Sequence, residues 1–181
     1  RSNPVRIFLL MILIMAGLFV VRGLKTGAIN PMLQTTITPT RSLNSFAQEG
    51  QTHFQAGNLE KAIEAYRNAV QIDPGNTELR ADLARIQVYS TSQITVDAEK
   101  RARYDEAIAI IDEGLAIDPQ DSALHAVKAF ALDWYGASGV AGEKSQEYLI
   151  KGEQSAVEAL QFDNTNALAM AYYAELLIDQ L

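Results

Sequence analysis

The sequence contains no cysteine, which excludes disulfide bonds, thiol chemistry and cysteine-ligated metals. Because a disulfide-free protein can occupy either side of a membrane, this absence does not fix the compartment. Histidine is scarce as well: the chain has two, and neither stands beside a plausible nucleophile or metal ligand in sequence. No glycine-rich loop of the phosphate-binding type follows a predicted strand. We therefore expect no enzyme activity, no catalytic residue, no metal and no cofactor.

Acidic side chains are missing from the first 42 residues, where the five charged residues are all basic and give a net charge of +5. The rest of the chain holds ten of the 15 basic residues and all 22 acidic ones, a net charge of −12. Such an acidic body argues against a nucleic-acid partner, because phosphate binding needs a basic surface. A basic protein partner would suit it, although the charge can also serve solubility alone.

One long apolar run, IFLLMILIMAGLFVV over residues 7–21, lies between Arg6 and Arg22. Residues 5–24 would form a helix of about 30 Å, the thickness of a hydrocarbon core, with both arginines reaching the interfaces. We predict a transmembrane helix at residues 5–24, after an N-terminal flank at residues 1–4. The side chains expected to face lipid include Ile7, Leu9, Leu10, Ile14, Leu18 and Val21.

A cleaved signal peptide is the alternative, because Thr26, Gly27 and Ala28 offer small residues for cleavage. The run is long for a signal and is separated from that site, which favours a retained anchor. Flanking charges on the two sides are balanced, so they do not decide the orientation. The Thr/Pro-containing linker at residues 25–42 is typical of extracytoplasmic stalks, and we place the following domain outside the cytoplasm.

Three helix-ending triplets recur at a fixed interval after the linker. They are Ile72-Asp73-Pro74, Ile117-Asp118-Pro119 and Phe162-Asp163-Asn164, and each follows an amphipathic pattern and precedes an Asn or Asp cap. The spacing is 45 residues in both intervals. A period of this size indicates a solenoid of stacked helix pairs.

The stretch SFAQEGQTHFQAGNLEKAIEAYRNAVQIDPGN (residues 45–76) resembles a tetratricopeptide repeat along its whole length. The resemblance implies an all-α solenoid in which the small residue Gly50 packs against Ala62 and Tyr66 fills the space between repeats. Pro74 ends the second helix because it lacks an N–H donor. Counting the weaker later matches, the repeat-packing residues are Gly50, Gly57, Ala62, Tyr66, Ala69, Pro74, Ala107 and Pro119.

We therefore predict about three and a half helix pairs. The repeats occupy residues 43–76, 77–121 and 122–166, and the first helix of a fourth occupies residues 167–181. The family repeat has about 34 residues, so the second and third each carry an insertion between their paired helices, both on one edge of the stack. The last helix would expose Met170, Tyr173 and Leu177. We expect a further helix of the chain, or another subunit, to cover this face.

Ligands of this family bind mainly to the first helix of each pair, which by resemblance gives a groove. Here Ala47 and Gln51 occupy positions of the carboxylate clamp found in some members, so a clamp is not expected. Aromatic anchors suit an amphipathic helix or extended peptide instead. The alternative is that Tyr89 and Trp134 pack under the insertions. The predicted groove residues are Gln51, Phe54, Arg85, Tyr89, Phe130, Asp133 and Trp134.

These features favour a single-pass membrane scaffold for protein–protein interaction, an accessory or assembly subunit of a larger membrane complex, for example respiratory or photosynthetic. Its expected partners are other proteins, integral membrane subunits among them, and the lipid bilayer through residues 5–24. We expect no nucleic acid and no small-molecule substrate. One alternative is a transient client-binding factor in envelope biogenesis, pilus assembly or secretion. Another is the anchor and repeat part of a longer chain with an enzymatic domain beyond residue 181.

Overall fold

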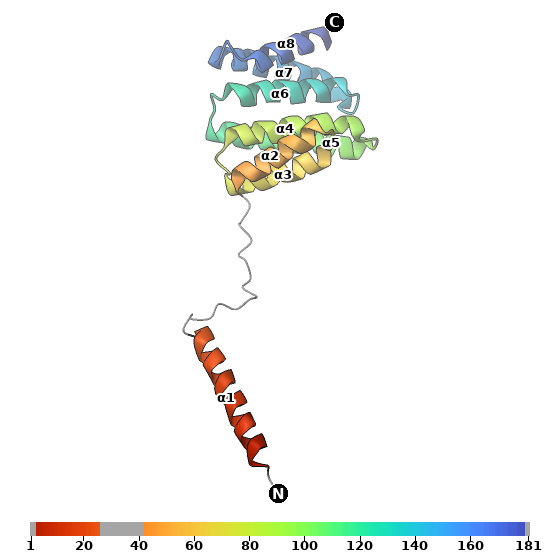
Figure 1. Cartoon of the computed structure of the whole chain (residues 1–181). Helices are drawn as coiled ribbons and strands as arrows, with labels where there is room; N and C mark the ends of the chain where they lie inside the picture. Colours follow the sequence, from red (N-terminus) through yellow and green to blue (C-terminus); the bar gives the residue numbers. More distant parts are fainter. Residues whose placement is uncertain (1–2, 26–41, 180–181) are drawn as a thin grey trace. The chain divides into compact units, whose positions relative to one another are not determined.

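A computed structural model describes residues 3–25 and 42–179, and every regular element in these ranges is a helix (Figure 1). The chain divides into two compact units, residues 1–40 and residues 41–181, which are described separately below. Most of the predicted linker, residues 26–41, lies outside the described residues.

The first unit contains α1, Pro4–Lys25. Asn3 caps it, because its side-chain oxygen accepts a hydrogen bond from the backbone N–H of Val5 at 3.1 Å, and Pro4 suits the first helical position. Residues Pro4–Gly23 have a mean hydropathy of 2.6 and are long enough to cross a membrane. A signal sequence near an N-terminus can meet the same criteria of length and composition.

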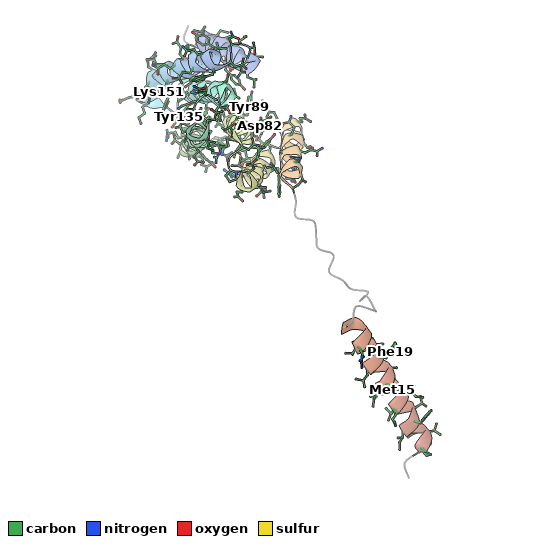
Figure 2. The ribbon with its side chains drawn as sticks, turned by 90° about the vertical axis from the view of Figure 1, so that its left-hand side faces the viewer. Met15, Phe19, Asp82, Tyr89, Tyr135 and Lys151 are labelled. Atoms are coloured by element: carbon green, nitrogen blue, oxygen red, sulfur yellow. The ribbon has the colours of Figure 1, made fainter. Side chains whose placement is uncertain are left out.

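The apolar side chains of α1 project outward around the helix, as Met15 and Phe19 do in Figure 2. Arg6 and Arg22 are also exposed and bracket the apolar stretch. An apolar surface without a polar stripe suits lipid better than water. The six predicted lipid-facing side chains, Ile7, Leu9, Leu10, Ile14, Leu18 and Val21, are all between 51% and 64% exposed.

Residues 42–179 of the second unit form an array of seven α-helices, in which each helix pair packs as a hairpin and stacks on the next pair (Figure 1). Residues 43–76 contain α2 and α3, residues 77–121 contain α4 and α5, and residues 122–166 contain α6 and α7. The helices are α2 (Leu43–Gln55), α3 (Leu59–Ile72), α4 (Thr77–Ser90), α5 (Asp97–Ile117), α6 (Ser122–Ala137), α7 (Ser145–Phe162) and α8 (Ala167–Asp179).

The same turn joins each pair to the next. The three first-helix caps, Asn76, Asp121 and Asn166, accept a hydrogen bond from the backbone N–H three residues later, at 3.0 to 3.1 Å. Each cap also donates its own backbone N–H to the carbonyl of the C-cap residue of the preceding helix, at 3.2 to 3.3 Å. Helix stop and helix start are therefore one hydrogen-bonded unit that recurs every 45 residues.

A second polar contact repeats with the same period. The buried Arg80 donates to the carbonyl of Pro74 at 3.0 Å and pairs with Glu113 at 2.7 Å. Forty-five residues later, Nε2 of His125 lies 2.9 Å from the carbonyl of Pro119, and its Nδ1 lies 3.0 Å from Glu158. In both repeats, therefore, a side chain that can carry a positive charge contacts the turn and also the second helix of the pair that follows this turn.

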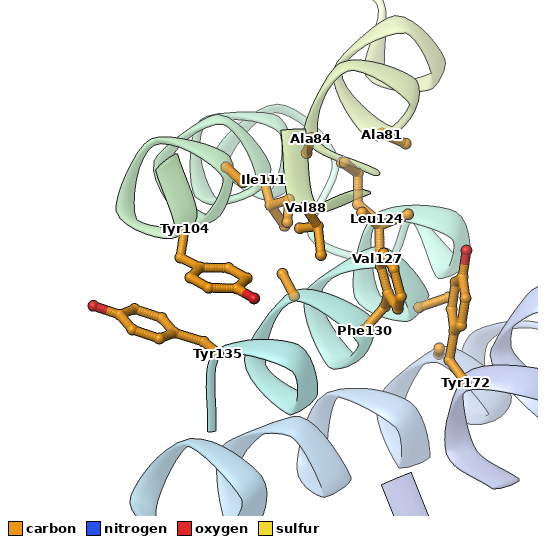
Figure 3. Close-up of a cluster of buried hydrophobic side chains, with 14 of the residues drawn as sticks. Ala81, Ala84, Val88, Tyr104, Ile111, Leu124, Val127, Phe130, Tyr135 and Tyr172 are labelled. Carbon is orange, nitrogen blue, oxygen red and sulfur yellow. The ribbon is translucent and has the colours of Figure 1, made fainter. Parts of the chain in front are cut away.

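The two insertions meet at one edge of the array. The first forms a 3-10 turn, Thr91–Gln93, and then begins the long helix α5; the second forms the 3-10 turn Gly142–Lys144. Arg101 of the first donates a hydrogen bond to the carbonyl of Val140 in the second at 3.3 Å. Beneath them the ring of Tyr135 stacks on Tyr104 at 4.7 Å (Figure 3) and on Tyr148 at 4.5 Å.

Repeat-packing residues lie where small or aromatic side chains are required. Ala62, Ala69 and Ala107 are fully buried and Tyr66 is 3% exposed. Pro74 and Pro119 lie exposed in the turns, and Gly57 adopts a φ of +75° in the turn after α2, a conformation that favours glycine.

The nearest side chain to Gly50 is the ring of Tyr66: a Cβ on Gly50 would lie 2.5 Å from Cδ2 of that ring. The ring cannot retreat easily, because it fills the core between α3 and α4 with Leu79 and Leu83. The buried ring of Tyr66 therefore requires a small residue at position 50.

We predict that Gly50→Ala lowers the free energy of unfolding by about 1 to 2 kcal/mol, because overpacking against Tyr66 outweighs the gain in helix propensity. Denaturant unfolding followed by circular dichroism measures the change. Gly75→Ala is the matched control, because its Cβ would meet no atom closer than 3.8 Å. Equal stability of the two variants would contradict this account of the packing.

Candidate protein-interaction face

Aromatic rings from all four first helices form a continuous row. Tyr89 of α4 lies at the centre, with ring centroids 5.9 Å from Phe54 of α2 and 5.6 Å from Trp134 of α6. Tyr89 also lies 5.1 Å from Phe130, which stacks at 4.6 Å on Tyr172 of α8. We call Phe54, Tyr89, Phe130, Trp134 and Tyr172 the aromatic row. Its members contact one another across the first helices, and the insertions do not separate them.

The five rings differ in exposure, which changes the roles predicted for them. Phe54, Tyr89 and Trp134 are partly exposed and can contact a ligand. Phe130 is 2% exposed and packs in the core beside Tyr172 (Figure 3), so its predicted role as a surface anchor is wrong. Phe130 supports the exposed rings instead. Tyr172 was missed, because α8 is apolar on most of its surface and its pattern does not reveal which side faces the neighbouring helix.

The polar side chains predicted at the same face are already paired. Arg85 forms an ion pair with Asp82 at 2.7 Å and lies 5.6 Å above the ring of Phe54. Gln51 is exposed and accepts a hydrogen bond from the hydroxyl of Tyr66 at 3.3 Å. Burial, and then the neighbouring Asp82, raise the pKa of Tyr66 to about 12. Asp82 and Tyr89 mark this part of α4 in Figure 2.

Asp133 is unusual among the predicted residues, because it is 1% exposed and neither carboxylate oxygen has a hydrogen-bond partner. Burial, followed by repulsion from Asp179 and Glu175 of α8, raises its pKa to about 7. Its neighbour Trp134 donates its indole N–H to Glu175 at 3.1 Å. The α8 end of the aromatic row is therefore acidic. Asp133, like Phe130, lies beneath the face, and its predicted place as a lining residue is corrected accordingly.

Hollows of ligand size lie on other parts of the array. One of about 450 Å³ is bordered by α5, α6 and α7, including Asp112, Lys128 and Tyr148. Asp112 and Lys128 on its border form an ion pair at 2.7 Å. Within residues 3–25 and 42–179, no group of three or more His, Asp or Glu side chains is arranged to hold a metal ion.

Comparison with known proteins agrees with this geometry. Residues 53–88, from the last turn of α2 to α4, match the family model described as tetratricopeptide repeat. In its fold, the array resembles tetratricopeptide-repeat solenoids. No curated protein matches the sequence.

Solved tetratricopeptide structures share the fold at low sequence identity. The first such domain of Spaghetti (RPAP3), bound to an HSP90 peptide, is 13% identical, with a TM-score of 0.53 over 76% of this chain and 92% of that chain. The Yersinia enterocolitica type III secretion chaperone SycD, in complex with a peptide of the translocator YopD, is 12% identical, with a TM-score of 0.51 over 81% and 100%. A thermophilic TPR protein of Thermus thermophilus, TTC0263, is 14% identical, with a TM-score of 0.50 over 76% and 82%.

The raised pKa of Asp133 predicts how the stability of the helical array depends on pH. Folded Asp133 holds its proton up to about pH 7, whereas the unfolded side chain loses it near 3.8, so stability falls as pH rises between these values. We expect Asp133→Asn to remove this dependence and to raise the free energy of unfolding at pH 8 by about 2 kcal/mol. Denaturant unfolding from pH 4 to pH 8 measures it.

The control for that series is Glu143→Gln, because Glu143 is exposed on the 3-10 turn of the second insertion. Its profile should follow that of the unmodified protein. A profile of Asp133→Asn that is parallel to the unmodified one over the whole range would show that the buried carboxylate does not titrate as described.

Proposed function

We propose that this protein is a membrane-anchored scaffold, whose first-helix face binds a segment of another protein at the membrane surface. The observation that carries the proposal is the aromatic row: Phe54, Tyr89 and Trp134 are partly exposed and come from three successive first helices. Tyr89 and Trp134 pack on the buried ring of Phe130. Aromatic side chains on a packed base are frequent energetic centres of protein interfaces. An amphipathic helix or an extended peptide is long enough to contact all three.

The anchor supports the membrane part of the proposal. Helix α1 is apolar on its entire surface and bracketed by arginines. A tether of this kind confines the array to a thin layer and raises its effective concentration toward membrane-bound partners. Placement of the array outside the cytoplasm remains part of the proposal and rests on the linker composition alone.

Two kinds of partnership are compatible with the face. In the first, the chain is a permanent accessory or assembly subunit of a larger membrane complex with integral membrane partners, for example a respiratory or photosynthetic one. In the second, it holds clients transiently, which is favoured by the similarity to SycD, a secretion chaperone bound to a translocator peptide. Aromatic contacts suit both, and the lifetime of the complex distinguishes them.

We expect a photoreactive phenylalanine analogue at position 89 or 134 of the full-length protein to crosslink one or a few proteins in native membranes. The same analogue at position 157, where Val157 is exposed on α7, is the matched control and should crosslink the same proteins weakly or not at all. Mass spectrometry of the crosslinked bands identifies the partners.

Mild detergent extraction before irradiation then separates the two partnerships. A crosslink that survives extraction supports a permanent subunit, and a crosslink that is lost supports a transient client. Equal crosslinking from positions 89, 134 and 157 would contradict the assignment of the first-helix face as the binding surface.

For the anchor, we expect the double substitution Leu10→Arg and Ile14→Arg to move the protein from the membrane fraction to the soluble fraction. Each arginine at the centre of a spanning helix costs about 2.5 to 3.5 kcal/mol. Gln71→Arg with Gln161→Arg adds the same charge on exposed positions of the array and should leave the protein in the membrane. A mature chain whose intact mass lacks residues 1–25 would identify a cleaved signal sequence instead.

A further inference from the structure

Three carboxylates converge where the aromatic row reaches α8. Glu175 is held against Trp134 by the indole hydrogen bond at 3.1 Å, and Asp179 is exposed one helical turn further along. Asp133 lies below them, buried and without a hydrogen-bond partner for either oxygen. The electrostatic effect of Glu175 and Asp179 on Asp133 places all three within interaction range.

This negative charge has no cation to balance it. Among the described residues, no lysine, arginine or histidine forms an ion pair with any of the three carboxylates. Arg85 lies on the same face, but it is paired with Asp82 at 2.7 Å. Burying an ionised carboxylate without a partner is costly, and the nearby like charges add to the cost. A bound cation would reduce both the cost of burying the charge and the repulsion between the carboxylates.

We propose that Glu175 and Asp179, with Asp133 beneath them and the ring of Trp134 beside them, form a subsite for a lysine or arginine side chain of the partner polypeptide. The inference rests on the proposed function and adds the chemistry of one ligand position to it. The carboxylates accept charge-assisted hydrogen bonds, and the indole offers an aromatic face to the cation. The basic residue of the partner polypeptide would therefore lie at the α8 end of the aromatic row.

A side-chain cation suits this position better than a metal ion. The carboxylates lie on two helices, and one oxygen of Glu175 is already committed to the indole N–H. In the described parts of the chain, these groups are not arranged as metal ligands. A guanidinium or ammonium group needs hydrogen-bond acceptors in looser geometry, which two surface carboxylates above a buried one provide.

The chain contains a single tryptophan, so its indole resonance and its fluorescence report on this site alone. We would titrate the full-length protein, in an uncharged detergent at constant ionic strength, with N-acetyl-arginine amide and with its neutral isostere N-acetyl-citrulline amide. The expected result is a saturable shift of the Trp134 indole signal with the arginine compound and about ten-fold weaker binding of the citrulline compound.

Substitution tests the carboxylates directly. Glu175→Gln with Asp179→Asn should weaken the arginine compound about ten-fold toward the citrulline level, while the amide oxygen at position 175 can still accept the indole hydrogen bond. Glu99→Gln with Glu143→Gln removes the same charge from exposed positions near the insertions and should leave binding unchanged. Binding by the unmodified protein should also weaken below pH 7, where Asp133 takes up a proton, and Asp133→Asn should abolish that dependence.

Equal response to the arginine and citrulline compounds, or no response to either, would overturn the subsite. The photo-crosslinking from positions 89 and 134 decides the proposed function separately, so the two can fail independently. The same indole signal is also measured with phosphatidylcholine vesicles. A shift with vesicles and none with the arginine compound would assign the acidic end to a lipid headgroup and would also overturn the proposal.

Discussion

The turn that joins one helix pair to the next is the constraint on which the array depends. Each turn ends one helix, caps the following one and fixes the angle between them through the same backbone and side-chain hydrogen bonds, at Asn76, Asp121 and Asn166. Because the unit recurs every 45 residues, each first helix lies on the same face of the array. The aromatic row exists because Phe54, Tyr89, Trp134 and Tyr172 lie on helices that these turns place side by side.

The repetition is strong in the backbone and weaker in the side chains. Arg80 and His125 tie their turns to the following second helix, and the corresponding position on α8 is Met170, which is 49% exposed. Leu168, Leu177 and Ile178 are exposed on the same helix. At the position of α6 equivalent to Leu177, Leu132 is buried and packs against Gly152 of α7. Met170 and Leu177 therefore lie on a surface of α8 that corresponds to the one covered by α7 on α6, as the sequence predicted.

The sequence predicted the parts of the structure that depend on local rules. Pro74, Pro119 and the Asn or Asp caps act within one turn, so the helix ends and the 45-residue spacing could be inferred from residue type alone. How deeply a side chain is buried could not be predicted in this way. Phe130 and Trp134 lie four residues apart on α6, yet Phe130 is buried by Tyr172 and Trp134 remains at the surface. Which side chain is covered depends on contacts from α8, which lies about 40 residues away.

The energetics of the face follow from this division between buried and exposed groups. Tyr89 and Trp134 contact the buried Phe130 and each other, and Phe54 contacts Tyr89, so these rings would lose little conformational freedom on binding the proposed ligand. Arg85 and Gln51 already have partners within the chain and would have to exchange them, so their net contribution to affinity is small. Asp133 is the opposite case: the equivalent position of the preceding repeat is Val88, fully buried in the core, and the carboxylate there destabilises the free protein. In the proposed complex a cationic ligand would offset that instability, so the rings would supply the general affinity of the face and the acidic end its selectivity.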